Sequence, residues 1–407
     1  MTERHPALHW YWRALACTLL GAASLAAAAR DLTIGVVFVP DDARYDTKRL
    51  EKSYPGQPLG RPRTGAEVAI AESEFQLSSA SLKVTLRDVA ADDVAAARTQ
   101  ILALAQKGVR HFLLDLPGAD VAELSKSLHS SDLLLFNVSA AEDTLRRSAC
   151  AANLFHTLPD ESMMADAMAQ FLTARKWNRV LLLSSTEPAD ASRTASVRQA
   201  IKRYALKLTG DKTYKLSNDP RERELGNVAL LTAGSDADVV WVVDTDGEFA
   251  RDVPYRTNLA RPVVGNAGLV AEAWQASWER YGAPQLSRRF RKAAGRPMAS
   301  ADWAAWMATK AILEVAVKVP DAREHRRALR SADTVLDGFK GVRLSFRPWD
   351  QQLRQPVFLA HGGVGGGIAG MAPFDGFLHP INALDTLGAD QKESPCHLSD
   401  TAAGAKK

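Results

Sequence analysis

Short apolar runs alternate with amphipathic helical patterns along most of this chain. The runs with strand character lie at residues 32–39, 82–86, 109–116, 133–137, 179–184, 239–244, 262–265, 342–346 and 357–361. The helical patterns lie at residues 65–76, 93–107, 120–128, 162–175, 191–204, 222–232, 272–281 and 302–319. Neighbouring parallel strands need a crossover connection, usually a helix, so this order predicts parallel sheets with helices on both faces.

The alternation breaks near residues 151–159 and then resumes with the same rhythm. A chain of 407 residues is also too long for one ordinary hydrophobic core. The fold class we expect is therefore α/β, with two doubly wound, Rossmann-like lobes. Because ligands of open α/β sheets bind at the carboxyl ends of the strands, we expect a binding cleft between the lobes.

The first 29 residues have the pattern of a secretory signal peptide. Arg4 and Arg13 lie in a basic stretch, residues 14–26 are largely apolar, and three alanines follow at residues 27–29. The apolar run is shorter than the ~20 residues that are needed to span a bilayer. We expect cleavage near Ala29 and a mature protein in the periplasm.

Charge and cysteine content narrow the class of protein. The formal net charge is only +4, without a basic stripe or a nucleic-acid-binding motif, so we expect no nucleic-acid partner. Loss of the signal peptide leaves two cysteines, Cys150 and Cys396, which permit one disulfide in an oxidising compartment. Two unpaired thiols are the alternative. We expect the mature chain to be a monomer.

Motifs for catalysis and for metal binding are missing from the sequence. It contains neither His-Glu-x-x-His nor Gly-x-Ser-x-Gly. Gly365, Gly367 and Gly370 have the spacing of a dinucleotide-binding loop, but Pro373 follows where a helix should begin. Residues 244–248 resemble part of a calcium loop, although acids there also cap helices. We expect a binding protein rather than an enzyme, with no metal and no permanent cofactor.

Polar and small residues follow several of the expected strands, at the ends where ligands bind. In the first lobe the candidate ligand-binding residues are Pro117, Gly118, Asn137 and Ser139. In the second lobe or the hinge they are Ser185, Thr186, Asp244, Thr245, Asn266 and Gly268. Ordinary turn and helix-cap chemistry is the alternative role for each of them.

Three segments resemble a known family. They are Gly65-Ala-Glu-Val-Ala69, Asp88-Val-Ala-Ala-Asp92 and Gly108-Val-Arg-His-Phe-Leu-Leu114. These segments and the layout of residues 31–361 are similar to type I periplasmic binding proteins of ABC importers, which include the branched-chain amino acid receptors. The resemblance implies a three-strand hinge, closure of two lobes on a small-molecule ligand, and importer membrane subunits as partners.

The same resemblance implies where the chain passes between the lobes. The first lobe would comprise residues 30–154 and 266–337, and the second lobe residues 155–265 and 338–361. Residues 362–407 would form a loop-like tail outside both lobes, and residues 1–29 the signal peptide.

A further set of motifs resembles a narrower subgroup. The motifs lie at residues 243–249, 254–257, 261–265, 301–306, 339–341, 344–356, 376–379, 384–388 and 393–396. Together they are similar to binding proteins associated with alcohol oxidation systems that depend on pyrroloquinoline quinone (PQQ). The resemblance implies PQQ or a compound from alcohol catabolism as cargo, and a PQQ-dependent dehydrogenase as a further partner. Asp115-Leu-Pro-Gly-Ala-Asp120 replaces the Gly-x-x-x-Ser loop of the amino-acid receptors, which argues against an amino acid.

PQQ is a planar tricarboxylate, so its site needs an aromatic face and cationic groups. We expect Trp303 to offer the face and the loop residues Arg61 and Arg256 to bind carboxylates. Core packing for the tryptophan and solvated surface charge for the arginines are the alternatives. Two other functions stay open: a receptor for an amino acid or an alcohol-derived organic acid, and a periplasmic cofactor carrier or sensor without transport.

Overall fold

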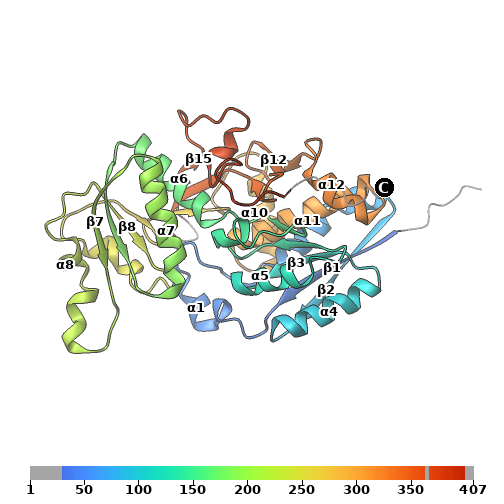
Figure 1. The fold of residues 1–407 in the computed structure, drawn as a ribbon, viewed down its shortest axis with the longest axis horizontal. Coiled ribbons are helices and arrows are strands. Elements are labelled where there is room, and N and C mark those ends of the chain that lie inside the picture. The colour runs from blue at the N-terminus through green and yellow to red at the C-terminus, as the bar shows by residue number, and fades with distance from the viewer. Residues whose placement is uncertain (1–29, 363–365, 399–407) are drawn as a thin grey trace, which may run out of the picture.

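Figure 1 shows the protein as a computed structural model, which describes residues 30–362 and 366–398. The expected signal peptide lies outside the described residues, so its cleavage stays a prediction. Within the described ranges, no helix combines the length and the apolarity that crossing a membrane requires.

The first lobe is built on a five-stranded parallel sheet with the order β2-β1-β3-β4-β5. Its strands are β1 (Arg30–Phe38), β2 (Leu82–Ala90), β3 (His111–Asp115), β4 (Leu134–Asn137) and β5 (Leu154–His156). Its helices are α2 (Arg63–Glu72), α3 (Glu74–Ser79), α4 (Val94–Gln106), α5 (Gly118–Ser127), α10 (Ala283–Ala294), α11 (Ser300–Lys318) and α12 (His325–Arg330).

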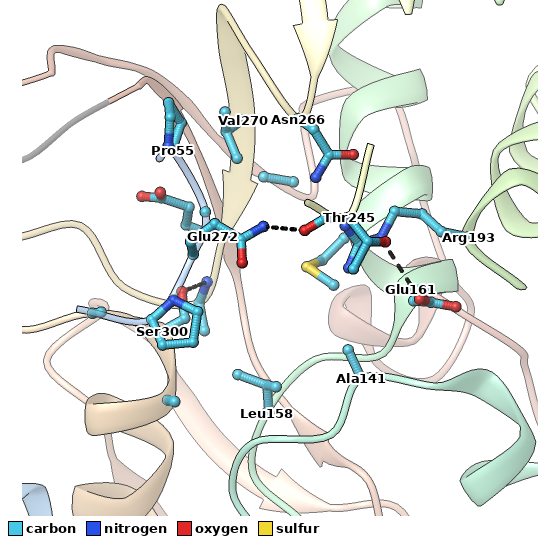
Figure 2. A pocket seen from close by; sticks show the side chains of 18 of the residues that line it. Pro55, Ala141, Leu158, Glu161, Arg193, Thr245, Asn266, Val270, Glu272 and Ser300 are labelled. Carbon is cyan, nitrogen blue, oxygen red and sulfur yellow. Dashed lines mark hydrogen bonds and ion pairs between the residues drawn. The ribbon is translucent and has the colours of Figure 1, made fainter. Parts of the chain in front are cut away.

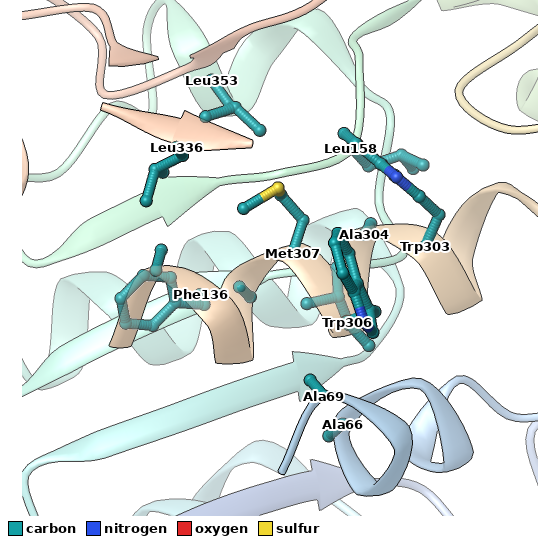
Figure 3. Packing of buried hydrophobic residues seen from close by; sticks show 14 of the residues in the cluster. Ala66, Ala69, Phe136, Leu158, Trp303, Ala304, Trp306, Met307, Leu336 and Leu353 are labelled. Atoms are coloured by element: carbon teal, nitrogen blue, oxygen red, sulfur yellow. The ribbon is translucent and has the colours of Figure 1, made fainter. Parts of the chain in front are cut away.

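Helices cover both faces of this sheet because side chains alternate along each strand. Val36 packs in the hydrophobic cluster that contains α2 and α11, whereas the next residue, Val37, packs against α4 and α5. Figure 3 shows α11 crossing α2, where Trp306 lies near Ala66 and Ala69. Thus α11 packs on a sheet whose strands all come from residues 30–156, so the first lobe is built from two distant parts of the chain.

The second lobe is built on a seven-stranded sheet with the order β15-β14-β10-β9-β8-β6-β7. Its strands are β6 (Arg179–Ser184), β7 (Lys207–Thr213), β8 (Val239–Val243), β9 (Val263–Gly265), β10 (Leu269–Glu272), β14 (Val357–His361) and β15 (Ile368–Ala372). Its helices are α6 (Glu161–Ala174), α7 (Pro188–Arg203), α8 (Val228–Thr232) and α9 (Val253–Arg256). Strands β14 and β15 run antiparallel to their neighbours, and the other neighbouring pairs are parallel.

The predicted fold class is confirmed: two α/β lobes are joined by three segments. The chain leaves the first sheet after β5, and it leaves the second sheet after β10 and returns at β14. Between these last two points lies a small sheet of β11 (Leu336–Asp337), β12 (Arg343–Phe346) and β13 (Leu353–Arg354).

Two of the expected passages between the lobes lie elsewhere in the structure. The second passage follows Glu272 rather than residue 265, because β10 pairs with both β9 and β14. The third lies after Arg354 rather than near residue 338, because Leu336, Leu344 and Leu353 pack in the first lobe's core with Trp303. The predicted helix at 272–281 is wrong, since these residues are the end of β10 and a loop.

The segment after His361 is also more ordered than the predicted loop-like tail. Residues 368–372 form β15 at the edge of the second sheet. Farther on, Asp385 accepts hydrogen bonds from Arg347 and Arg354 at 2.9 Å, and Cys396 forms the expected disulfide with Cys150. The tail therefore closes back onto the body of the protein.

Candidate ligand-binding site

A cavity of about 490 Å³ lies between the two lobes. Loops after β1, β3, β4 and β5 border it from the first lobe, and the ends of β8, β9 and β10 border it from the second. The first turns of α6, α7 and α11 complete its wall. The cavity thus lies at the carboxyl ends of parallel strands, where α/β folds bind ligands. Figure 2 shows its lining side chains.

Several of the predicted ligand-binding residues line this cavity: Pro117, Gly118, Ser139, Thr245 and Asn266. Their polar groups are partly engaged within the protein. Ser139 accepts a hydrogen bond from Arg44 at 3.0 Å, and the side-chain oxygen of Asn266 accepts one from the Asp244 backbone at 3.0 Å. These five predicted residues therefore border the cavity, and their role in ligand binding stays a prediction.

Other predicted residues at strand ends do not border the cavity, and two of them, Asn137 and Asp244, serve the fold instead. Asn137 is buried, and its amide donates to the Ala140 carbonyl at 2.7 Å. Asp244 caps a short helical turn, accepting hydrogen bonds from the backbone of Phe249 and Ala250 at 2.8 Å. The remaining three are outside the lining as well: Ser185 donates to Asp190, Thr186 is exposed, and Gly268 forms a turn with φ +67°.

Trp303 is not a ligand platform in this structure. It is fully buried, and its indole N–H donates to the Gly338 carbonyl at 3.1 Å. The ammonium of Lys340 lies 3.7 Å from its ring centroid. The aromatic side chains that do border the cavity are Tyr54, Trp241 and Trp274.

The two predicted carboxylate-binding arginines lie outside the cavity lining as well. Arg61 donates to the carbonyls of Val39 and Pro40 at 2.5 and 2.7 Å, so it anchors the loop after β1. Arg256 is 68% exposed and lies 3.6 Å from Asp252. Arg256 thus has the solvated surface position that was its alternative, whereas Arg61 has a structural role that the sequence did not predict.

Three other arginines border the cavity: Arg44, Arg49 and Arg193. Arg44 forms an ion pair with Asp42 at 2.6 Å, and Arg49 forms one with Asp246 at 3.0 Å. Arg193 is paired more loosely, with its Nε 3.6 Å from Glu161. Because guanidinium groups bind carboxylates through two parallel N–H donors, Arg193 is the best-placed group for a ligand carboxylate. Arg193 lies near the start of α7, the helix that follows β6. A search for basic residues at the helix starts that follow strands would have found it in the sequence.

Acidic residues balance these cations. Glu142 accepts a hydrogen bond from the Gly118 backbone at 3.2 Å, and Glu161 accepts one from Ser192 at 2.6 Å. Burial raises the pKa of Glu161, although Arg193 and Ser192 oppose the shift. Burial also raises the pKa of Glu272 to about 7, against a hydrogen bond from the Gly56 backbone. Among the described residues, no group of His, Cys, Asp and Glu has the arrangement of a metal site.

The rest of the wall is largely apolar. Its apolar side chains include Leu158, Met164, Met168, Val197, Trp241, Val243, Val270, Trp274 and Met298. Methionine side chains adapt to ligands of irregular shape, and aromatic rings favour flat ones. A cavity of this size, with apolar side chains and a set of charged and polar groups, is typical of small-molecule sites.

Comparisons with known proteins agree with this architecture. Residues 78–251 match the sequence model of a family described as periplasmic binding protein. A branched-chain amino acid ABC transporter periplasmic ligand-binding protein from Burkholderia xenovorans LB400 superposes with a TM-score of 0.67 at 13% identity, over 90% of this chain and 99% of that one. The fold is that of the type I periplasmic binding proteins.

Two further solved structures share the type I fold. One is an ABC transporter solute-binding protein from R. palustris in complex with benzoate, with a TM-score of 0.63 and 14% identity over 90% of this chain and 99% of that one. The other, from the same organism, is in complex with 4-hydroxybenzoate, with a TM-score of 0.62 and 11% identity over 83% and 95%. None of the curated proteins matches the sequence significantly.

Proposed function

We propose that this protein is the periplasmic substrate-binding component of an ABC importer and that it captures a small planar carboxylate between its lobes. The observation that carries the proposal is the loosely paired Arg193 beside an apolar cavity of about 490 Å³. Reversible binding, rather than chemistry, is the role of such a cavity, and the importer's membrane subunits are the proposed partners.

PQQ is the leading candidate for the cargo, because the sequence motifs imply it and because it combines a flat ring with carboxylates. The apolar wall with Trp241 and Trp274, rather than Trp303, would receive the ring. Arg193 would bind a carboxylate.

Simple aromatic or alcohol-derived acids are the second candidate. Arg44 and Arg49 are already paired with protein carboxylates, so Arg193 is the one arginine of the described lining that is paired loosely. This arrangement suits a single carboxylate better than three. The R. palustris proteins of the same fold, solved with benzoate and 4-hydroxybenzoate, support this candidate.

The experiment is a thermal-shift and titration screen of the mature protein with PQQ, benzoate, 4-hydroxybenzoate, short organic acids and branched-chain amino acids. A ligand at ~100 times its Kd stabilises the folded state by about 2.7 kcal/mol, which a melting curve detects. A shift with PQQ alone assigns PQQ, and a shift with the aromatic acids alone assigns the second candidate. An amino acid as the sole ligand, or no ligand at all, contradicts the proposal.

A matched pair of variants tests the role of Arg193. Arg193→Gln removes the guanidinium from the cavity, whereas Arg256→Gln removes one from the exposed surface. Loss of a charge-assisted hydrogen bond should weaken carboxylate binding about 10- to 100-fold in R193Q. R256Q should bind as the wild type does. Equal affinity of both variants would remove Arg193 from the site.

A further inference from the structure

Residues 47–57 of the first lobe lie against the cavity and contact the second lobe. They comprise α1 (Thr47–Lys52) and the loop that follows it, within the long connection after β1. Figure 1 shows α1 at the junction of the two lobes. Arg49 and residues 53–57 line the cavity, so this segment is part of its wall. We call residues 47–57 the strap.

The strap makes polar contacts with the loop that follows β8 in the second lobe. Arg49 pairs with Asp246 at 3.0 Å and donates to the Thr245 carbonyl at 2.8 Å. Gln57 donates to the same carbonyl at 2.9 Å. Lys52 forms an ion pair with Glu248. These contacts join the first lobe to the second beside the cavity.

The second lobe also fits the strap in shape, through two glycines. A Cβ atom on Gly247 would lie 2.5 Å from the ring of Tyr54, and one on Gly362 would lie 2.3 Å from Pro55. Tyr54 is buried in this contact, and its hydroxyl accepts a hydrogen bond from Arg251 at 3.4 Å. Close packing of this kind indicates a defined docked position rather than a chance approach.

We propose that the strap is a latch, which must detach from the second lobe before ligand enters or leaves the cavity. The proposal rests on the proposed function, since it takes the cavity as the ligand site. The two ion pairs are solvent-accessible, with Asp246 70% and Glu248 40% exposed, so each contributes little and salt screens both. A latch with such contacts opens reversibly, and its opening depends on ionic strength.

The first test needs no ligand. Lys48, Arg49 and Lys52 are trypsin sites within the strap. We expect the double variant D246N/E248Q, which keeps these sites, to be cleaved in the strap on the order of fivefold faster than the wild type. E51Q changes an exposed charge on the same helix outside these contacts and is the matched control. Mass spectrometry locates the cuts.

Salt gives the second arm of this test. At 1 M salt the screening length falls to ~3 Å, so the wild type and E51Q should approach the cleavage rate of the double variant. The latch is contradicted if D246N/E248Q and E51Q are cleaved in the strap at the same rate at low salt. It is also contradicted if cuts in the double variant occur throughout the chain, since that is global unfolding.

Ligand exchange is measured separately, by stopped-flow mixing with PQQ. Release should be several-fold faster from D246N/E248Q than from E51Q at low salt, with the difference lost at 1 M salt. Equal release rates at low salt contradict the latch. If PQQ does not bind, the cargo assignment fails, and the proteolysis result alone decides whether the strap detaches.

Discussion

The indole rings of Trp274 and Trp303 stack with their centroids 6.3 Å apart and their planes 10° from parallel, but only Trp274 borders the cavity. Trp303 is the inner member of the pair, enclosed by the core of the first lobe. Trp303 therefore contributes to the stability of the first lobe, and Trp274 to the wall of the candidate binding site.

Replacing each tryptophan by alanine should separate these roles. W303A should lose about 3–5 kcal/mol of unfolding free energy, the usual cost of emptying a large core position. W274A should lower ligand affinity more than W303A does, because it changes the cavity wall itself. Chemical denaturation and titration at a temperature where both variants are folded provide the measurements. Loss of binding in W303A with full binding in W274A would reverse the assignment.

Glu272 should make stability fall as the pH rises. Burial raises the pKa of this carboxyl from 4.5 to about 7, so the folded state holds a proton that the unfolded chain releases. The folded state is therefore favoured below pH 4.5 and loses this advantage as the pH rises to about 7. E272Q should be more stable than the wild type at pH 8 and less sensitive to pH across this window. Denaturation curves at several pH values test it, and identical profiles would contradict it.

The disulfide should stabilise the protein through the unfolded state. Cys150 and Cys396 are 246 positions apart in sequence, so their bond restricts a very long loop. The double variant C150S/C396S should lose about 2–5 kcal/mol of unfolding free energy. A reducing agent should lower the melting temperature of the wild type and leave that of the variant unchanged. A wild-type melting temperature that does not respond to reduction would count against this role.

Gly362→Ala should displace the strap without changing any charge. The added methyl group would lie 2.3 Å from Pro55, so one of the two backbones must move. We expect faster tryptic cleavage in the strap of G362A, with little dependence on salt. Gly367→Ala is the control, because a Cβ atom on Gly367 would meet open space. Gly295 also has open space but is unsuitable, because its φ of +68° would strain an alanine. Equal cleavage of G362A and G367A would show that the fit at Pro55 does not hold the strap.

The sequence predicted the parts of this fold that depend on local patterns. Strand β8 is buried along its whole length, as a continuous run of Val and Trp between helices indicates for a parallel strand. Asp93 caps α4 through a hydrogen bond at 2.7 Å, at the residue where the helical pattern begins in the sequence. Ser139, Thr245 and Asn266, which the strand-end rule selected, line the cavity, and their role in binding stays a prediction.

Tertiary structure decided which side chains meet. Residues 272–281 have a helical pattern in sequence, but Glu272 ends β10 instead, because β14, almost ninety residues later, pairs with this strand. Arg61 and Arg193 are both basic residues beyond a strand, yet one anchors a loop and the other borders the cavity. Periodicity and capping act between near neighbours, so the sequence alone determined the class of fold and the edges of its sheets. Packing between distant segments decides which residues face the cavity and holds the strap against the second lobe. No local sequence pattern encodes this packing.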